Sequence, residues 1–228
     1  MRVFFKSYFL CLFLLVNLNI FALQERTVSS RTCSIEAIVF GVDISISSYD
    51  GEAISYTADI KNDMKVSIIE DNNCLRFRNS HPVKGSIKVF VPKTMQLESC
   101  RVYSSSSSVN LSDVKAIYFT STMCEGNVNI TRSTFKVVSL SVASGNIKLD
   151  ADITSACDFC FSETKANLEI KGGLSDFNFF YPYEIFSSCS VNGKDCTKES
   201  KFGTDKKRRK RLGITQTSSK TVLNFIAR

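Results

Sequence analysis

Cysteine is the residue type with the widest chemistry in this sequence, because a thiol can bind a metal, carry redox chemistry or form a disulfide. The chain has nine cysteines and one histidine in 228 residues. Cys157 and Cys160 form a Cys-x-x-Cys motif, which is typical of zinc and redox sites. The residues around them alternate as in a β-strand, however, so the two thiols are expected on opposite faces. We therefore expect no metal or redox site there.

A second pair of cysteines, Cys189 and Cys196, flanks a polar stretch that contains Asn192 and Gly193. Asn and Gly favour tight turns, and a disulfide between the flanking cysteines would close such a turn. An even number of cysteines remains once Cys11 is removed with an N-terminal signal segment, which favours disulfides in an exported chain. We predict a Cys189–Cys196 disulfide and expect the other cysteines to be small core residues.

Catalytic side chains are not gathered in any motif that we recognise. His81 precedes Pro82 between two strand-like segments, and the sequence does not place beside it the partners that a metal ligand or a general base would need, so a loop position is expected. Asp150 and Asp152 lie two residues apart, but no glycine-aspartate repeat surrounds them to build a calcium site. Phosphate loops and nucleophile elbows are absent from the sequence. The sequence thus predicts a protein that is not an enzyme and uses no cofactor or metal.

Positive charge is concentrated near the C-terminus. Residues 23–193 carry 16 Lys and Arg against 19 Asp and Glu, whereas residues 194–228 carry 11 against 3. Six cations are consecutive: Lys206, Lys207, Arg208, Arg209, Lys210 and Arg211. In a cytosolic chain this basic run would indicate a nuclear signal or a nucleic-acid contact. In an exported chain we expect a solvated loop, with a contact to anionic lipid or polysaccharide, or proteolytic processing, as the alternatives.

The N-terminus has the layout of a secretory signal peptide. Arg2 and Lys6 precede an apolar run from Tyr8 to Phe21 that ends at Ala22. The run is short for a membrane-spanning helix, which needs about 20 apolar residues. We expect a signal peptide over residues 1–22 that is cleaved after Ala22, with an uncleaved anchor as the alternative. The mature protein would then be periplasmic, cell-surface or secreted.

Composition favours one strand-rich domain in the rest of the chain. Hydrophobic residues make up 43% and charged residues 22% of the sequence, which supports a core and argues against disorder. Three prolines, ten glycines and 18 phenylalanines stand among many Ser, Thr, Val and Ile residues. Such a composition favours β-strands over helices.

An internal repeat is the strongest structural signal. Two aliphatic residues around one polar residue recur at intervals of 19, 19 and 21 residues. The four copies are Val109–Leu111, Val128–Ile130, Ile147–Leu149 and Leu168–Ile170. In a strand the two aliphatic residues share the buried face, so the polar residue points outward. The predicted outward row is Asn110, Asn129, Lys148 and Glu169.

Each copy of the repeat follows a turn and a second strand. The turns Glu125–Asn127 and Ser144–Asn146 share a Gly-Asn pair. The second strands are marked by Ile117 and Phe119, by Val138, Leu140 and Val142, and by Cys157, Phe159 and Phe161. Units of about twenty residues cannot bury an apolar face alone, but stacked coils share one core. We predict an all-β fold over residues 35–195, a single β-solenoid with coils of 19–21 residues, in preference to a two-sheet sandwich.

Less regular segments on both sides of the repeat are expected to cap the solenoid. Short alternating runs over residues 42–91 should form antiparallel or wider first coils. An aromatic cluster over residues 177–183 should cover the last coil. Residues 196–228 should hold a basic loop and a final strand over Val222–Phe225.

A family resemblance follows from these residues. The segment Ile87–Pro92, then Leu97, then the repeats with a Gly-Asn turn and an aliphatic-polar-aliphatic strand resemble the putative-adhesin family of bacterial β-solenoid proteins. The pattern is also similar to the head domains of certain autotransporter adhesins. The resemblance covers roughly residues 35–195 and implies a β-solenoid without catalytic residues. The cysteines and the basic run depart from the family pattern.

Two functions follow as expectations. We expect a non-catalytic exported protein of the cell envelope or surface, an adhesin-like binding module. Its partner would be an anionic lipid or polysaccharide, or a host or cell-surface protein, and not a nucleic acid. The alternative is a structural, assembly or envelope-stress role, in which the open end of the solenoid adds strands from a partner. A polysaccharide-cleaving enzyme would need paired carboxylates, which the predicted outward row does not contain.

Overall fold

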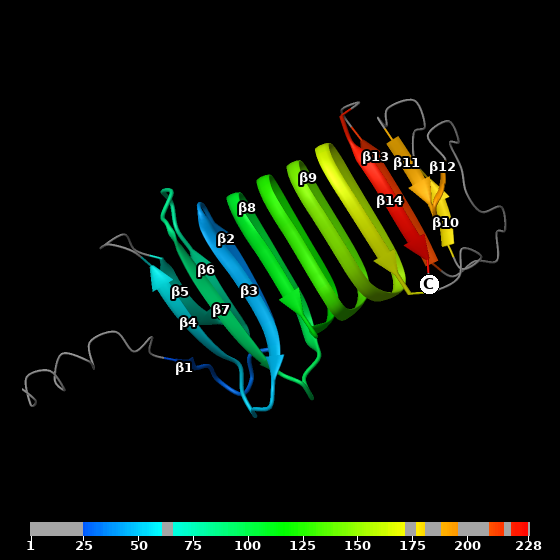
Figure 1. The fold of residues 1–228 in the computed structure, drawn as a ribbon. Helices are drawn as coiled ribbons and strands as arrows, with labels where there is room; N and C mark the ends of the chain where they lie inside the picture. Colours follow the sequence, from blue (N-terminus) through cyan, green and yellow to red (C-terminus); the bar gives the residue numbers. More distant parts are fainter. Residues whose placement is uncertain are drawn as a thin grey trace, which may run out of the picture.

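The computed structural model describes residues 25–60, 66–171, 177–180, 188–195, 210–216 and 220–227. The predicted signal peptide over residues 1–22 lies outside these ranges. The described chain is a stack of β-strands along one axis (Figure 1). The all-β prediction is therefore confirmed.

The strands follow one another in chain order with these bounds: β1 Arg26–Thr27, β2 Ser34–Val39, β3 Val42–Tyr49, β4 Ser55–Ile60, β5 Ser67–Asp71, β6 Cys74–Arg78, β7 Gly85–Pro92, β8 Leu97–Ser112, β9 Lys115–Ile170, β10 Phe177–Phe180, β11 Ser188–Val191, β12 Lys194–Asp195, β13 Lys210–Gln216 and β14 Val222–Ala227.

The centre of the stack is formed by successive flattened coils of the chain, drawn from green to yellow in Figure 1. β9 is 56 residues long because it continues through successive coils, about three at the spacing of the repeat. β8 pairs with β9 in parallel at a constant offset of 19 residues, from Leu97 opposite Ala116 to Ser112 opposite Thr131. Val109 therefore lies opposite Val128, as the repeat predicts. This register confirms a β-solenoid-like fold with a constant coil spacing and argues against the two-sheet sandwich.

Each coil has two arms, which we call the first and second arm. In β8 the first arm, residues 97–104, pairs with β2, and the second arm, residues 106–112, pairs with β3. Side chains that point inward from both arms form one continuous core. Ile147 and Leu149 are fully buried on the second arm, whereas Lys148 between them is exposed. The predicted inward and outward positions of the repeat are thus confirmed.

One inward position was predicted wrongly. Ile117 is only half-buried, and Ala116 and Phe119 fill the core on either side of it. Two consecutive residues, Ile117 and Tyr118, lie outside the core, so the strict alternation shifts by one residue at the start of this arm. Such a shift re-aims the following side chains, as a β-bulge does.

The order of coils at the N-terminal end differs from their order in the chain. β2 and β3 pair on one side with β8 and on the other with β6 and β7. The later segment, β6 and β7, is therefore the outer coil. β4 and β5 then add to it in antiparallel fashion, and β1 pairs with β4. The predicted antiparallel pairing is confirmed for β4 and β5, whereas β3 and β7, also within residues 42–91, pair in parallel.

The C-terminal end shows the same inversion. β13 and β14 pair in parallel with the last coil of β9, and β10 and β11 pair with their far sides. The final strand predicted over Val222–Phe225 is confirmed as β14, the last strand in chain order, although in the stack β11 lies on its outer side. Of the predicted aromatic cluster, residues 177–180 form β10, and residues 181–183 lie outside the described ranges. Chain order could not predict either arrangement, because parallel strand pairing depends on which edge is free and not on sequence distance.

Candidate functional site

The predicted disulfide site is described in part. Cys189 is buried on β11, and Cys196 lies outside the described residues. The turn between them is confirmed, since β11 and β12 form a hairpin across Asn192 and Gly193. Both turn residues have positive φ angles, 48° and 77°. The Cys189–Cys196 disulfide stays a prediction.

The basic run is also described in part. Lys206–Arg209 lie outside the described residues, whereas Lys210 and Arg211 begin β13. The backbones of these two residues pair with Phe177 and Asn178 of β10. The run therefore ends inside the sheet and not within a loop. Its contact with a polyanion stays a prediction.

The other chemistry-bearing residues are dispersed. Cys157 is buried and Cys160 is half-buried on the opposite face of β9, as predicted. His81 is exposed, and its Nδ1 lies 2.9 Å from the Ser80 hydroxyl oxygen. Asp152 lies 3.9 Å from the ammonium of Lys171. Within the described ranges, no three His, Cys, Asp or Glu side chains are grouped to hold a metal ion, and no helix is long and apolar enough to cross a membrane.

The outer face of the second arm carries a ladder of polar side chains. Asn146 Nδ2 donates a hydrogen bond of 2.9 Å to Asn127 Oδ1 of the preceding coil. Further along the stack, Asn167 lies opposite Asn224, whose Oδ1 accepts a hydrogen bond of 2.8 Å from the Ser190 hydroxyl. Stacked amides of this kind stabilise β-structures along the stacking direction. The ladder uses its hydrogen bonds within the protein, which favours a structural role.

Charged side chains at the end of the second arm are paired with one another. Lys93 Nζ lies 2.8 Å from Asp50, and Arg132 binds both carboxylate oxygens of Asp113 at 2.9 and 2.7 Å. The hydrogen bonds from Arg132, together with one from the Ser112 hydroxyl, hold the pKa of Asp113 below its usual range. This edge therefore offers a ligand little unpaired charge.

Replacing Asp113 with Asn tests the pairing at this edge. Because the folded pKa of Asp113 is lowered, its ion pair stabilises the protein above the ordinary Asp pKa of about 4, and this contribution is lost as the pH falls through the lower folded value. We expect Asp113→Asn to be slightly less stable than the wild type at pH 7 and equally stable at strongly acidic pH. The effect is small because the pair is exposed to solvent. Urea unfolding at both pH values measures it, and an equal deficit at both would contradict the assignment.

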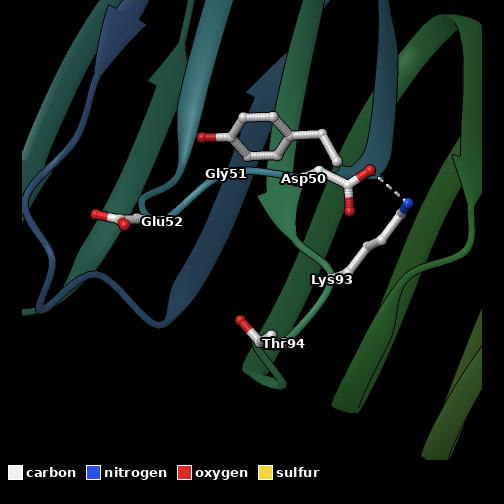
Figure 2. A pocket seen from close by; sticks show the side chains of 6 residues that line it. Asp50, Gly51, Glu52, Lys93 and Thr94 are labelled. Carbon is white, nitrogen blue, oxygen red and sulfur yellow. Dashed lines mark hydrogen bonds and ion pairs between the residues drawn. The ribbon is translucent and has the colours of Figure 1, made fainter.

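A shallow hollow of about 300 Å³ lies at the N-terminal end of this charged edge (Figure 2). Lys93 reaches across it to Asp50, while Glu52 and Thr94 point elsewhere. The loop passes so close to Tyr49 that a side chain at Gly51 would start 2.2 Å from its ring. The Asp50 carboxylate is held by Lys93, and no second acid faces it across the hollow. The hollow therefore has no arrangement suited to acid–base catalysis.

The outer face of the first arm is different in kind. Its outward residues on β8 and the start of β9 face one another in register, and we call them the tyrosine patch: Ser99 opposite Tyr118, Arg101 opposite Thr120 and Tyr103 opposite Thr122. Tyr118 is 50% and Tyr103 37% exposed, which places both among the large apolar side chains that solvent reaches. The patch combines two aromatic rings, three smaller hydroxyl side chains and one cation.

Arg101 has no ion-pair partner among the described residues. Its register neighbour Glu36 is already bound by Arg78 at 2.6 Å and by Arg76 at 3.6 Å. Arg76 also contacts Asp71 at 3.1 Å. Arg76 and Arg78 thus occupy both carboxylates, which leaves the guanidinium of Arg101 available to an anion.

Sequence reasoning missed the tyrosine patch. The signal was present, because Tyr103 and Tyr118 stand at positions where the alternation predicts outward side chains. A large aromatic residue at such a position is informative only when its neighbours on the same face are known. Those neighbours come from the register between coils.

The family of the chain follows from the stacked coils together with a match to a family model. The family model described as Toastrack DUF4097 matches residues 41–163, more than half of the chain. The chain belongs to the Toastrack family. The match lies within the predicted solenoid of residues 35–195, and the resemblance to autotransporter heads gains no support from it.

Among its relatives, this Toastrack chain is 25% identical over 170 residues to an uncharacterized protein of Treponema pallidum (strain Nichols), covering 73% of this chain and 70% of the relative. The structure of a "putative cell adhesion protein" from Clostridium sporogenes matches with a TM-score of 0.45 at 10% identity, covering 90% of this chain and 98% of the other. A "putative lipid binding protein" from Parabacteroides distasonis has a TM-score of 0.32 at 13% identity, covering 88% and 96%.

Proposed function

We propose that this Toastrack protein is a non-catalytic exported surface protein that binds an acidic polysaccharide on its tyrosine patch. The observation that carries the proposal is Arg101, which has no ion-pair partner among the described residues and is set between two exposed tyrosines on one sheet face. The N-terminal layout of residues 1–22 supports export. The periplasm, the cell surface and the external medium are all compatible locations.

The geometry of the patch suits a polymer better than a single sugar. Tyr103 lies opposite Thr122, which is four residues from Tyr118 on the same strand. At about 3.3 Å per residue and 4.8 Å between strands, the two tyrosines are about 14 Å apart. Aromatic rings pack against the apolar faces of sugars while their hydroxyls remain in water. The Ser and Thr hydroxyls between them can both donate and accept hydrogen bonds.

The positive charge of Arg101 favours an acidic polymer over a neutral one. Arginine binds carboxylates through two parallel hydrogen bonds, and the carboxylates near Arg101 are already occupied by Arg76 and Arg78. The next coil places Val137, Ser139 and Ser141 at outward, half-buried positions, so it adds no acid to repel the ligand. By contrast, cations at the end of the second arm are bound to Asp50 and Asp113. The patch is therefore the better site for an anion.

Binding to hyaluronan, a polymer with a carboxylate on alternate sugars, tests the proposal, with dextran as the neutral comparison. We expect Arg101→Gln and Tyr118→Ala each to weaken hyaluronan binding at least tenfold in biolayer interferometry, which is about 1.4 kcal/mol. Both side chains are exposed, so thermal stability should hardly change. Added salt should weaken binding by screening Arg101.

Lys148→Gln is the matched control, because it removes an exposed cation from the other arm. It should leave binding unchanged. Binding that survives Arg101→Gln and Tyr118→Ala but is lost when Lys206–Arg209 become serine would assign the contact to the basic run and refute the patch. Equal affinity for dextran would refute the acidic ligand.

A structural or assembly role is the second candidate. Among the described strands, β10 pairs only with β13, so one of its backbone edges lacks a described partner. An edge of this kind can accept a strand from another protein. Pull-down of an envelope protein that requires β10, with the tyrosine patch dispensable, would favour this role.

A further inference from the structure

The C-terminal segment of the chain fills a position between two earlier segments. We call residues 210–227, which contain β13 and β14, the closing coil. Arg211–Gln216 pair with Ala156–Phe161, and Val222–Ala227 pair with Lys165–Ile170. On the other side, β13 pairs with β10 and β14 with β11. The last segment of the chain therefore separates β9 from β10 and β11.

The closing coil is a part of the core. Its inward side chains Leu212, Leu223 and Phe225 are at most 2% exposed, and Ile214 is 4% exposed. All four belong to the same hydrophobic core as the coils of β9. Without the closing coil, the inner faces and backbone edges of its neighbours would lack their partners, which is costly for apolar and hydrogen-bonding groups alike.

We propose that the closing coil exchanges between two copies of this chain, so that each copy completes the stack of the other. The place that the closing coil occupies, which we call the slot, lies between β9 on one side and β10 and β11 on the other. The closing coil of a second copy presents the same side chains in the same register. The slot of one copy therefore accepts its own closing coil and that of a second copy equally well. Exchange of an identical element is a low-cost route to a symmetric dimer.

The connection before the closing coil permits either arrangement. It comprises residues 196–209, between the end of β12 and the start of β13. To return in the same copy, the chain must cross from the second arm to the first, about 10 Å, and move along the stack by about two strand spacings of 4.8 Å. Fourteen residues span this path easily, since an extended chain covers about 3.4 Å per residue. The proposal does not depend on the tyrosine patch.

A native cysteine allows the exchange to be trapped in full-length protein. Cys160 on β9 lies opposite Thr215 on β13, and both side chains are outward. Neighbouring strands hold such pairs about 5 Å apart, within the range of a disulfide. One full-length chain keeps Cys160 and Thr215. The other carries Cys160→Ser and Thr215→Cys, so a disulfide between Cys160 and the thiol introduced at position 215 can join only two different copies.

The two chains are mixed, unfolded, refolded together at high protein concentration and treated with diamide. Two thiols lose two protons and two electrons to diamide, which becomes the hydrazine, and one S–S bond forms. We expect a disulfide-linked heterodimer on non-reducing gels, with the bond between positions 160 and 215 identified by peptide mass spectrometry. Each chain refolded alone should not form this bond.

Shortening the connection should drive the exchange. Deleting residues 197–208 leaves two residues between β12 and β13, which reach about 10 Å and cannot make the return in one copy. We expect at least tenfold more dimer in size-exclusion chromatography, with the β-sheet circular dichroism unchanged. A folded monomer from the shortened chain would overturn the proposal. So would a co-refolded mixture of the unshortened chains that forms no disulfide between positions 160 and 215, whether or not the shortened chain folds.

Discussion

Ile147→Asp is expected to destabilise the protein by several kcal/mol and to unfold the central stack. Ile147 is fully buried in the second arm of a middle coil of β9. An aspartate there would place a carboxylate among apolar side chains from several coils. Each coil is stabilised mainly by its two neighbours, so a defect in the middle disrupts contacts on both sides.

Lys148→Glu is the control for this prediction, since the side chain of Lys148 is exposed on the adjacent position. Its effect should stay within about 0.5 kcal/mol. The chain has no tryptophan, so far-UV circular dichroism during urea unfolding is the suitable measurement. Asn129 would be a poorer control, because its Oδ1 is buried and has no hydrogen-bond partner among the described residues. Equal stabilities of Ile147→Asp and Lys148→Glu would contradict the register of the coils.

The register of the central coils could be predicted from sequence because the repeat is local. Each triplet such as Val128–Ile130 alternates, and its copies recur at nearly constant spacing, so one period specifies both the arm and the face. Ile117 escaped the prediction because two consecutive outward residues interrupt the alternation. An apolar residue beside such an irregularity looks like a core residue from sequence alone.

The order of coils at the two ends could not be predicted in this way. The residues of β14 have the alternation of any other strand, and nothing in that pattern distinguishes a place beside β9 from a place beyond β11. Likewise, the aliphatic residues of β7 predict a strand but not that β3 separates it from β8. Periodicity reports which face of a strand is buried, whereas the partner of its edge depends on the whole fold.

The candidate binding site depends on both kinds of information. The outward positions of Tyr103 and Tyr118 follow from alternation, but their grouping with Arg101 follows from the pairing of β8 with β9. The availability of Arg101 depends further on the ion pairs that Arg76 and Arg78 of β6 make with Glu36, which connect residues 40 and 42 positions apart. A pattern of neighbouring residues in the sequence cannot report a contact over such a separation. The basic run was conspicuous in sequence, yet two of its six residues belong to a strand of the core-forming closing coil.

Gly145→Ala is expected to be the most damaging of the conservative substitutions, at about 3 kcal/mol or more. Gly145 lies at the corner between the two arms with φ of 141°, a conformation that other residues rarely adopt. A Cβ there would lie 1.7 Å from the carbonyl oxygen of Gly126 in the preceding coil. Gly126 repeats the arrangement, since its own Cβ would lie 1.9 Å from the Ser107 carbonyl oxygen. The corner glycines thus let successive backbones approach along the stack axis, and a methyl group would force the coils apart.

Gly193→Ala separates the effect of contact from that of conformation. Gly193 also has a positive φ, 77°, but nothing lies within 4 Å of a Cβ placed there. Its replacement should therefore cost only the conformational penalty, about 1 kcal/mol. Urea unfolding of both variants against the wild type gives the comparison. Because the stack couples neighbouring coils, Gly145→Ala should also broaden the transition by allowing the two halves of the stack to unfold separately. If both alanine variants lose the same stability, close stacking at the corner is not what requires glycine at position 145.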